Sequence, residues 1–407
     1  MNIAMCTRVM PAHSIGGMQD HVQTLSAGLV ARGHRVCVIT TARADGIETE
    51  RVDGVEIYYL PGTTPGRYSA AYWRASAQKF ARLHAAHAFD ILHSHSIAAS
   101  GIYRADLPAQ LRVPLVASLH GTHLDVLTTA WHTDFALTKP LGAARFFAIA
   151  AQMFLNYAAR DRAFIRGAQC LIATSDADPA KYQLLYRVPA ARIRTVYNGI
   201  DARLFAPAQV NAEARRALAL EPDTKIILAL ARLQKDKGVQ NAIAMLPRVL
   251  EKFRVALVIV GDGDYRAALE MQARQLSLTA HVRFVGARTL NECARYFQAC
   301  DIFVDPTLRT DGYDLTIAEA MACEKLVIAS DVGANSTLVD ATTGILIPRG
   351  DNAALARETL RALENPNAAA EMGKRARQKI LARFSTDAMV EGMTRVYEEL
   401  KNDRIIA

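Results

Sequence analysis

Short apolar runs alternate with helix-like segments along nearly the whole chain, and this alternation limits the choice of fold more than any other feature. Before residue 200 the strand-like runs lie at 2–7, 34–40, 55–60, 90–93, 115–119, 169–174 and 193–197. A second series lies at 226–230, 256–260, 282–285, 301–304 and 326–329. Strands that alternate with helices predict an α/β protein with doubly wound parallel sheets. No GxGxxG sequence follows the first run, which argues against a dinucleotide-binding dehydrogenase.

The length of 407 residues suits two domains better than a single core. A turn-rich sequence, NGIDARLFAP at 198–207, separates the two strand series. We therefore predict an N-terminal domain over 1–200, a C-terminal domain over 201–385 and a final helix over 386–407. The six cysteines show no CxxC or metal-type spacing, which favours reduced core thiols, a cytoplasmic location and the absence of a zinc site.

The net charge of +8 is concentrated in the first half of the chain. Residues 1–200 carry 20 Lys and Arg against 13 Asp and Glu. This imbalance favours an anionic partner for the N-terminal domain, either a membrane surface or a phosphate-bearing acceptor, and ordinary scatter of surface arginines is the alternative. No aromatic and basic platform accompanies the charge, so we do not expect nucleic acid as a partner.

One apolar segment, 146–159, is interrupted only by Gln152 and Asn156 and has arginines on both sides. It is too short to cross a bilayer, but an interfacial helix of this kind could place the protein on the inner face of the membrane. A buried helix is the competing interpretation. We favour burial because apolar residues occur nearly all round the helix.

The stretch 301–333 combines two apolar runs with an acidic loop and a helix expected over 315–323. Asp311 and Glu319 are eight positions apart, and Glu319 lies one turn into that helix. In open α/β sheets, ligands bind at the carboxyl ends of the strands, where such helices begin. Two acidic side chains there suit a ligand with several hydroxyl groups, and we expect a sugar nucleotide.

Four further sequences recur in a fixed order with this stretch. They are the Gly16-Gly17 pair before a helix, HSHS at 93–96, LHGTH at 119–123 and ARLQKDKG at 231–238. The ordered set resembles the retaining nucleotide-sugar glycosyltransferases of family 4. The resemblance implies the GT-B architecture, in which two Rossmann-like domains face each other across a cleft and the final helix packs back on the N-terminal domain.

Three positions depart from the pattern of that family. Asp311 replaces the first Glu of E-x7-E, Asp314 replaces a Gly, and Glu324-Lys325-Leu326 replaces Gly-Lys-Pro. The shorter side chain of Asp311 is expected to change the sugar preference. Asp314 could repel an anionic donor, bind a donor hydroxyl or simply cap the helix, and we favour the hydroxyl ligand.

The resemblance implies roles for individual residues. His120 would reach the hydroxyls of the donor sugar, and Asp311 would hold the transferred sugar. Arg232 and Lys237 would bind the diphosphate, where fixed cations stabilise charge that grows on the leaving group. Glu319 would accept hydrogen bonds from the ribose hydroxyls.

The remaining donor-binding positions would act mainly through the backbone. Glycines and helix amino ends let amide groups approach phosphate or sugar oxygens closely. The base would lie near the loops that follow two strands of the second series, so its identity cannot be read from side chains. These positions are Gly16, Gly17, Gly261, Arg288, Asp314, Leu315 and Thr316.

We therefore predict a retaining hexosyltransferase-type glycosyltransferase that transfers a sugar from a nucleotide-diphosphate sugar to a hydroxyl acceptor in glycan, glycolipid or metabolite biosynthesis. The cations Arg232 and Lys237, rather than a metal ion held by an acidic pair, are expected to bind the diphosphate, so we expect metal-independent transfer and no cofactor. The alternatives are a nucleotide-sugar epimerase or hydrolase of the same fold, and a non-catalytic sugar-nucleotide binding protein.

Overall fold

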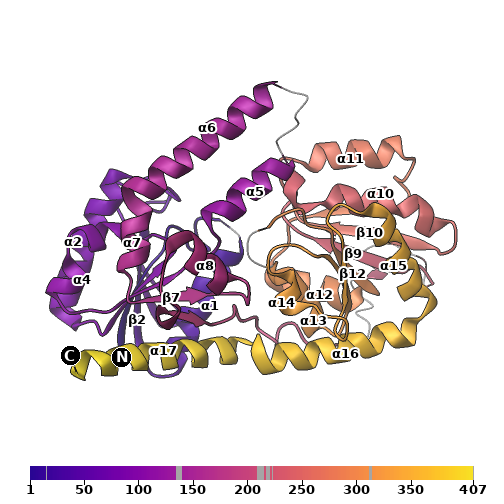
Figure 1. Ribbon diagram of the computed structural model, residues 1–407. Coiled ribbons are helices and arrows are strands. Elements are labelled where there is room, and N and C mark those ends of the chain that lie inside the picture. The colour runs from indigo at the N-terminus through magenta and orange to yellow at the C-terminus, as the bar shows by residue number, and fades with distance from the viewer. Residues whose placement is uncertain are drawn as a thin grey trace. The chain divides into compact units, whose positions relative to one another are not determined.

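The computed structural model describes residues 1–14, 16–133, 140–208, 215–216, 221, 223–310 and 314–406 (Figure 1). The chain divides into two compact units. Unit 1 comprises Met1–His123, Phe147–Gly199 and Thr386–Ala407, and unit 2 comprises Leu124–Phe146 and Ile200–Ser385.

The units differ from the predicted ranges because Leu124–Phe146 belongs to unit 2. Two hydrogen bonds explain this assignment. The Thr310 hydroxyl donates to the carbonyl of Asp125 at 3.0 Å, and the Thr310 amide donates to the hydroxyl of Thr129 at 3.2 Å. A prediction based on strand spacing does not detect this exchange, because the partners are far apart in the sequence.

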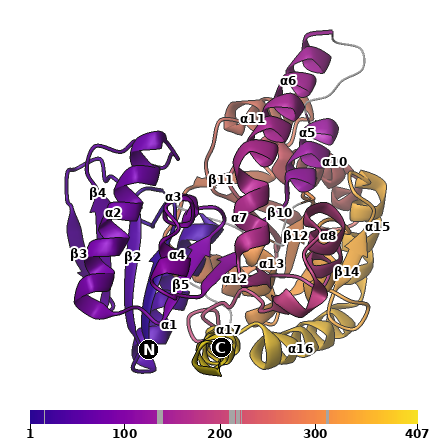
Figure 2. The ribbon, with the colours of Figure 1, turned by 60° about the vertical axis from the view of Figure 1, so that its left-hand side comes forward.

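Unit 1 contains a sheet with the strand order β3-β4-β2-β1-β5-β6-β7-β8. All neighbouring strands are parallel except β3 and β4. Helix α2 packs against β2 and β4 (Figure 2). The strands are β1 (Asn2–Cys6), β2 (Arg35–Thr41), β3 (Thr49–Val52), β4 (Val55–Leu60), β5 (Ile91–His95), β6 (Leu115–Ser118), β7 (Cys170–Ala173) and β8 (Ile193–Thr195).

The helical segments of unit 1 cover both faces of this sheet. Two helices, α5 (His123–Thr133) and α6 (Pro140–Asn156), contain residues of both units. The others are α1 (Gly17–Ala31), α2 (Ala70–His87), α3 (Ser100–Arg104), α4 (Leu107–Gln110), η1 (Tyr157–Asp161), α7 (Arg162–Gly167), α8 (Asp178–Tyr186), η2 (Ala190–Arg192) and α17 (Thr386–Ile406).

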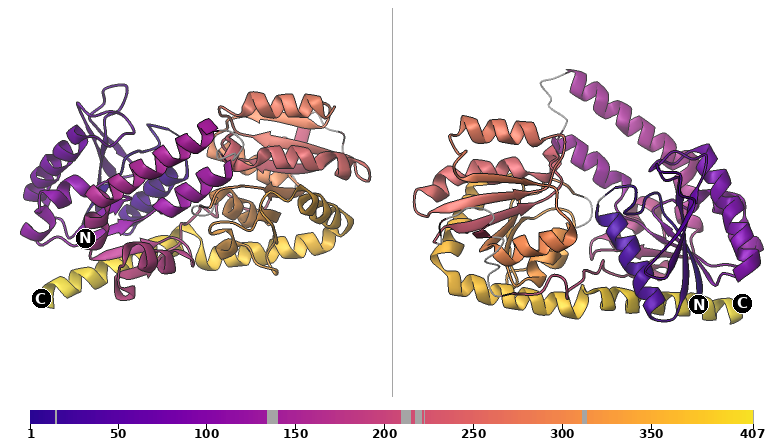
Figure 3. Two further views of the ribbon diagram at one scale, coloured as in Figure 1. Left: turned by 45° about the horizontal axis from the view of Figure 1, so that its top comes forward. Right: turned by 180° about the vertical axis from the view of Figure 1, so that it is seen from behind.

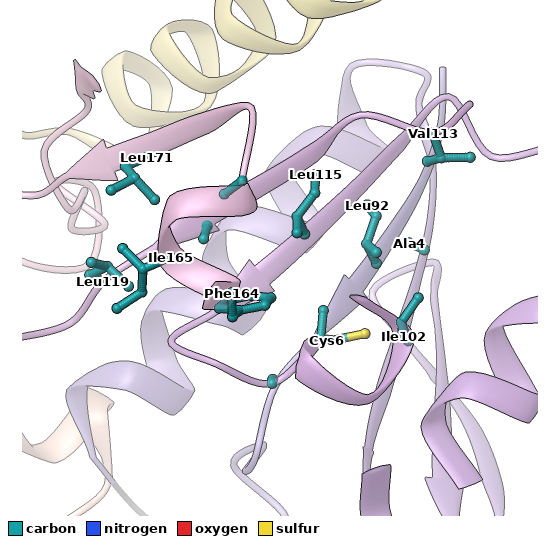
Figure 4. Packing of buried hydrophobic residues seen from close by; sticks show 14 of the residues in the cluster. Ala4, Cys6, Leu92, Ile102, Val113, Leu115, Leu119, Phe164, Ile165 and Leu171 are labelled. Atoms are coloured by element: carbon teal, nitrogen blue, oxygen red, sulfur yellow. The ribbon is translucent and has the colours of Figure 1, made fainter. Parts of the chain in front are cut away.

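The two faces of the unit 1 sheet carry separate apolar cores. In β1, Ala4 and Cys6 belong to one core, and Ile3 and Met5 belong to the other. This division follows from the two-residue period of a strand, and it explains why the whole strand is apolar. Figure 4 shows the first core, in which Phe164 packs among residues of the strands and helices.

The second core of unit 1 includes α17. Met389, Val390 and Tyr397 are buried among residues of α1 and the sheet. A Cβ atom added to Gly28 of α1 would lie 2.4 Å from Val390 Cγ2, so the absence of a side chain permits this close approach. Helices α1 and α17 accordingly lie side by side (Figure 3).

Unit 2 contains a parallel sheet with the order β11-β10-β9-β12-β13-β14. The order reverses between β9 and β12, as it does between β1 and β5 of unit 1. Ligands of doubly wound sheets bind at such reversals, at the carboxyl ends of the strands. The strands are β9 (Lys225–Leu230), β10 (Val255–Val260), β11 (Val282–Gly286), β12 (Ile302–Asp305), β13 (Leu326–Ser330) and β14 (Ile345–Ile347).

An apolar core on one face of the unit 2 sheet contains Leu257, Ile259, Val304 and Ile328 from the strands. Helix α10 contributes Ile243 to the same core. The helical segments are η3 (Lys235–Lys237), α10 (Val239–Leu250), α11 (Arg266–Gln275), α12 (Leu290–Ala299), α13 (Leu315–Ala322), α14 (Asn335–Leu338), α15 (Asn352–Glu364) and α16 (Pro366–Arg383).

The predicted burial of segment 146–159 is wrong. Phe147, Phe154 and Leu155 are 64%, 69% and 61% exposed. The neighbouring α7 covers the sheet instead, with Phe164 and Ile165 buried in the core of unit 1. Among the described residues, no helix is both long and apolar enough to cross a membrane. The six cysteines are free and buried, which confirms the prediction of core thiols.

Candidate functional site

The connection between β9 and α10 is held against the loop that follows β12. Gly238 has φ 70°, and a Cβ atom there would lie 1.8 Å from the carbonyl oxygen of Pro306. The Leu308 amide donates to the carbonyl of Asp236 at 2.7 Å. Only glycine fits this combination of positive φ and close backbone contact, so Gly238 brings the two loops together.

Lys237 reaches the amino end of α13 through this contact. Its ammonium group donates to the carboxylate of Asp314, and the two side chains are only 11% and 20% exposed. Arg232 is exposed and has no ion-pair partner within the described part of the chain. The predicted diphosphate pair therefore consists of one exposed cation and one cation held by a carboxylate.

Asp314 occupies the N-cap position of α13, but its side chain accepts no hydrogen bond from the helix amides. The interpretation of Asp314 as a capping residue is therefore wrong. The carboxylate binds Lys237 instead, because the Lys237 charge lies within direct reach. Whether Asp314 also binds a donor hydroxyl stays a prediction.

The sequence reasoning missed Asp305, the last residue of β12. Burial, together with the nearby carboxylate of Asp314, raises the pKa of Asp305 well above its usual value. Burial also acts to raise the pKa of Asp314, but the Lys237 ammonium and Arg309 outweigh it and hold that pKa below its usual value. Because the pKa of Asp305 is raised and that of its neighbour Asp314 is lowered, we assign the proton of the pair to Asp305. A carboxyl at the end of an apolar run was the available sequence signal.

Helix α13 positions the remaining predicted donor contacts. Leu315 and Thr316 begin the helix, so their amide groups belong to the first turn, which is not hydrogen-bonded within the helix. Glu319 lies further along and is 8% exposed. Asp311 lies outside the described residues, so its role stays a prediction.

The loops after β10 and β11 lie next to the β9 connection. Gly261 has φ 133°, a Cβ atom there would lie 1.9 Å from the carbonyl oxygen of Ala231, and its amide donates to the carbonyl of Gly286 at 2.9 Å. Arg288 follows β11, with its Nε 3.8 Å from Glu292. The predicted base-binding positions therefore share one edge of the sheet with Arg232.

In unit 1 the predicted Gly16-Gly17 pair lies at the amino end of α1. Gly16 is extended, with φ 166°, and its carbonyl accepts a hydrogen bond from the Asp20 amide at 3.1 Å. Burial raises the pKa of the Asp20 carboxyl to about 6. An acidic group in this first helical turn would oppose a bound phosphate when ionised, so the phosphate contact stays a prediction.

A cluster of histidines lies at the carboxyl ends of β5 and β6. His95 ends β5, His120 follows β6, and His21 lies in α1. The His95 Nδ1 and His120 Nε2 atoms are 3.2 Å apart, and the His21 ring is 5.1 Å from the His120 ring between centroids. His120 therefore lies beside two other imidazoles, and its contact with the donor sugar stays a prediction.

Burial keeps these imidazoles neutral. It lowers the pKa of His93 to about 3 and that of His120 to about 4, and it lowers the pKa values of His21 and His95 well below the usual range. His93 has partners for both ring nitrogens: Ser118 Oγ at 2.8 Å and the Tyr397 hydroxyl at 2.6 Å. His93 is thus a core residue with satisfied hydrogen bonds.

Comparison with protein families gives two matches that together span most of the chain. Residues 15–204 match the model described as Glycosyltransferase Family 4. Residues 210–379 match the model described as Glycosyl transferases group 1. The boundary between the matches falls in the segment that links the two strand series.

Curated relatives cover nearly the same span. An uncharacterised glycosyltransferase of Methanocaldococcus jannaschii is 28% identical over 340 residues, covering 82% of this chain and 81% of the relative. The D-inositol 3-phosphate glycosyltransferase of Kineococcus radiotolerans is 26% identical over 427 residues, covering 96% of this chain and 92% of the relative.

Solved structures show the same fold. Sucrose-phosphate synthase from Thermosynechococcus elongatus gives a TM-score of 0.79 at 23% identity and covers 99% of both chains. Anabaena HepE in complex with UDP-glucose gives a TM-score of 0.73 at 21% identity, covering 98% of this chain and 100% of that one. The likeness confirms the predicted GT-B fold class.

Proposed function

Because the chain belongs to family 4 of the glycosyltransferases, we propose that it transfers a sugar from a nucleotide-diphosphate donor to a hydroxyl acceptor with retention of anomeric configuration. The observation that carries this proposal is the contact between Lys237 and Asp314. It brings Lys237, which follows β9, to the amino end of α13, the helix that also contains the buried Glu319. The same loop carries the exposed Arg232.

The two cations would act on the leaving group. Negative charge grows on the diphosphate as its bond to the sugar breaks, so Arg232 and Lys237 stabilise the transition state more than the ground state. Asp314 holds Lys237 before the donor arrives. The donor diphosphate would take the place of this carboxylate on the Lys237 ammonium.

The other predicted residues would position the donor. Glu319 accepts hydrogen bonds from the ribose, His120 contacts the hydroxyls of the transferred hexose, and Asp311 holds that sugar. In a front-face substitution, the leaving phosphate accepts the proton of the acceptor hydroxyl while that oxygen attacks the anomeric carbon. Arg232 and Lys237 supply the positive charge at the diphosphate, so the transfer needs no metal ion.

The solved HepE structure holds UDP-glucose, which makes a UDP-hexose the first donor to test. The acceptor would carry negative charge or lie at an anionic membrane surface, because the first half of the chain is basic. The exposed Phe154 and Leu155 of α6 would assist peripheral contact with the inner face of the membrane. Sedimentation with anionic and with neutral vesicles tests this contact; equal binding to both would contradict it.

Nucleotide release from a panel of UDP-, GDP- and ADP-sugars tests the proposed reaction. We expect release from one donor only when an acceptor is present, and Lys237→Ala should lower kcat by about 100- to 1000-fold. Lys235→Ala is the matched control, since Lys235 is an exposed lysine of the same turn. Full activity of Lys237→Ala would contradict the proposed site.

The same assay separates the alternatives. An epimerase would convert the donor without releasing the nucleotide, and a hydrolase would release it without an acceptor. A binding protein would bind one donor with no turnover over a broad acceptor panel. A product analysis by anomeric NMR decides retention, because an inverted linkage would rule out the proposed stereochemistry.

A further inference from the structure

We propose that His21, His95 and His120 form a binding site for a divalent metal ion of the zinc class, and that the bound ion withdraws His120 from the donor sugar. The three residues come from α1, from the end of β5 and from the loop after β6. Each can offer one ring nitrogen, and these nitrogens lie within 4.8 Å of one another. The second part of the proposal rests on the role of His120 in the proposed function.

The geometry is close to that of a metal site. A tetrahedral zinc ion with Zn–N bonds of about 2.0–2.1 Å holds its ligand nitrogens about 3.4 Å apart. The His95 Nδ1 and His120 Nε2 atoms are already 3.2 Å apart. His21 lies edge-on to both rings, with centroid distances of 5.4 Å to His95 and 5.1 Å to His120. Small rotations of these side chains would bring a third nitrogen within bonding distance.

Unsatisfied nitrogen atoms point to a missing partner. Within the described part of the chain, both ring nitrogens of His21 are buried and have no hydrogen-bond partner. His95 Nε2 also lacks one, but it is not the nitrogen of His95 that lies near His120. The two residues are 4% and 0% exposed. Buried polar atoms without partners are uncommon because each costs about 1–3 kcal/mol, and a metal ion would use the lone pair of one His21 nitrogen.

The chemistry of the cluster selects the class of metal. Neutral imidazoles suit Zn²⁺, Co²⁺ or Cu²⁺, whereas Mg²⁺ and Ca²⁺ prefer oxygen ligands. Burial lowers the pKa values of all three residues, so each ring keeps a lone pair at neutral pH. His120 is partly exposed, which leaves that side open for a solvent molecule as fourth ligand.

Neighbouring His93 does not belong to this site although its ring centroid is 4.3 Å from that of His95. Both of its nitrogens already have partners, Ser118 and Tyr397. An ordinary polar core would give each histidine hydrogen-bond partners, as it does for His93. The unpartnered nitrogens of His21 favour a metal site instead.

Metal binding is tested on the full-length, untagged protein after treatment with a chelator. We expect one Zn²⁺ per chain by calorimetry, and visible d–d bands of a low-symmetry site when Co²⁺ is added. Loss of a residue that merely supports a ligand costs about 10–100-fold in metal affinity, so His21→Ala should weaken zinc binding by at least about tenfold. His34→Ala is the control, because His34 is a half-buried histidine of the same unit outside the cluster.

Zn²⁺ and Co²⁺ binding by the wild-type protein tests whether the metal site exists, even if His21→Ala folds poorly. Absence of Co²⁺ bands, or equal Zn²⁺ affinity in His21→Ala and wild type, would overturn it. Sugar transfer is then measured in metal-free protein with and without Zn²⁺. We expect zinc to inhibit the wild type and His34→Ala but not His21→Ala; zinc binding without inhibition would overturn the competition for His120. Absence of transfer in metal-free protein would contradict the proposed function alone.

Discussion

The sheets of both units reverse their strand order at the first strand, but they place different chemistry at this point of reversal. In unit 1 the carboxyl ends of β5 and β6 carry neutral histidines, of which His93 and His95 are buried and His120 is partly exposed. In unit 2 the ends of β9 and β12 carry Arg232, Lys237 and the Asp305–Asp314 pair. The shared topology fixes where side chains gather, whereas their type and burial determine what they can bind. Unit 2 therefore suits an anionic donor, and unit 1 suits hydroxyl groups or a metal ion.

The largest expected effect concerns Glu319, the buried acidic residue of α13 in unit 2. Glu319→Ala should lower kcat/KM for the nucleotide sugar by about 10²- to 10⁴-fold, because two hydrogen bonds to a charged group contribute about 1.5–3 kcal/mol each. Steady-state kinetics with the preferred donor measure this loss. Glu251→Gln, at an exposed position after α10, is the control. Unchanged kinetics in Glu319→Ala would remove the ribose contact.

The second prediction concerns acid stability, in which the units should differ. His93 has a folded-state pKa of about 3, below the ordinary value of 6.5, so the unfolded chain binds more protons at acidic pH. The contribution of His93 to the free energy of unfolding is therefore complete above pH 6.5 and is lost as the pH falls toward 3. At pH 5 this loss is about 2 kcal/mol. We expect unit 1 to unfold before unit 2 on acidification of metal-free protein.

The two tryptophans report on this order of unfolding, since Trp73 lies in unit 1 and Trp131 in unit 2. Urea unfolding at pH 7.5 and pH 5, followed by fluorescence in Trp131→Phe and in Trp73→Phe, measures the two units separately. The pH dependence of unit 1 should shrink in His93→Gln. Coincident transitions at pH 5 would show that the buried histidines do not separate the units.

The smallest expected effect concerns Asp314. Asp314→Asn removes the charge that holds Lys237, so the KM for the nucleotide sugar should fall by about tenfold, or about 1.4 kcal/mol, with little change in kcat. Asp331→Asn, at an exposed position after β13, is the control. A rise in KM would instead favour Asp314 as a ligand of a donor hydroxyl, as the sequence analysis proposed.

Much of the fold could be predicted because its signals are local. Strand β1 places alternate residues in two apolar cores, so the residues on both of its faces must be apolar. Short apolar runs between helices therefore indicate a parallel sheet. The apolar segment that contains Phe154 shows the limit of this reasoning. Composition does not show which of two neighbouring helices packs on the sheet. In this protein α7 contributes buried residues to the core, and Phe154 of α6 stays exposed.

The site was predictable only as a set of positions. The order of motifs pointed to Arg232, Lys237 and Glu319, and their roles stay predictions. The ion pair of Lys237 with Asp314 joins residues 77 positions apart, and the histidine cluster joins three separate elements. The periodicity of a sequence does not reveal contacts between residues that lie so far apart along the chain.

The sequence by itself determined the alternation of strands and helices, the two-domain plan and the residue types available at each strand end. Only the tertiary structure decided which charges neutralise each other, which histidines lack partners and which apolar side chains stay exposed. The physical reason is that periodicity arises from neighbours along the chain, whereas burial and electrostatic pairing depend on contacts between residues that folding brings together.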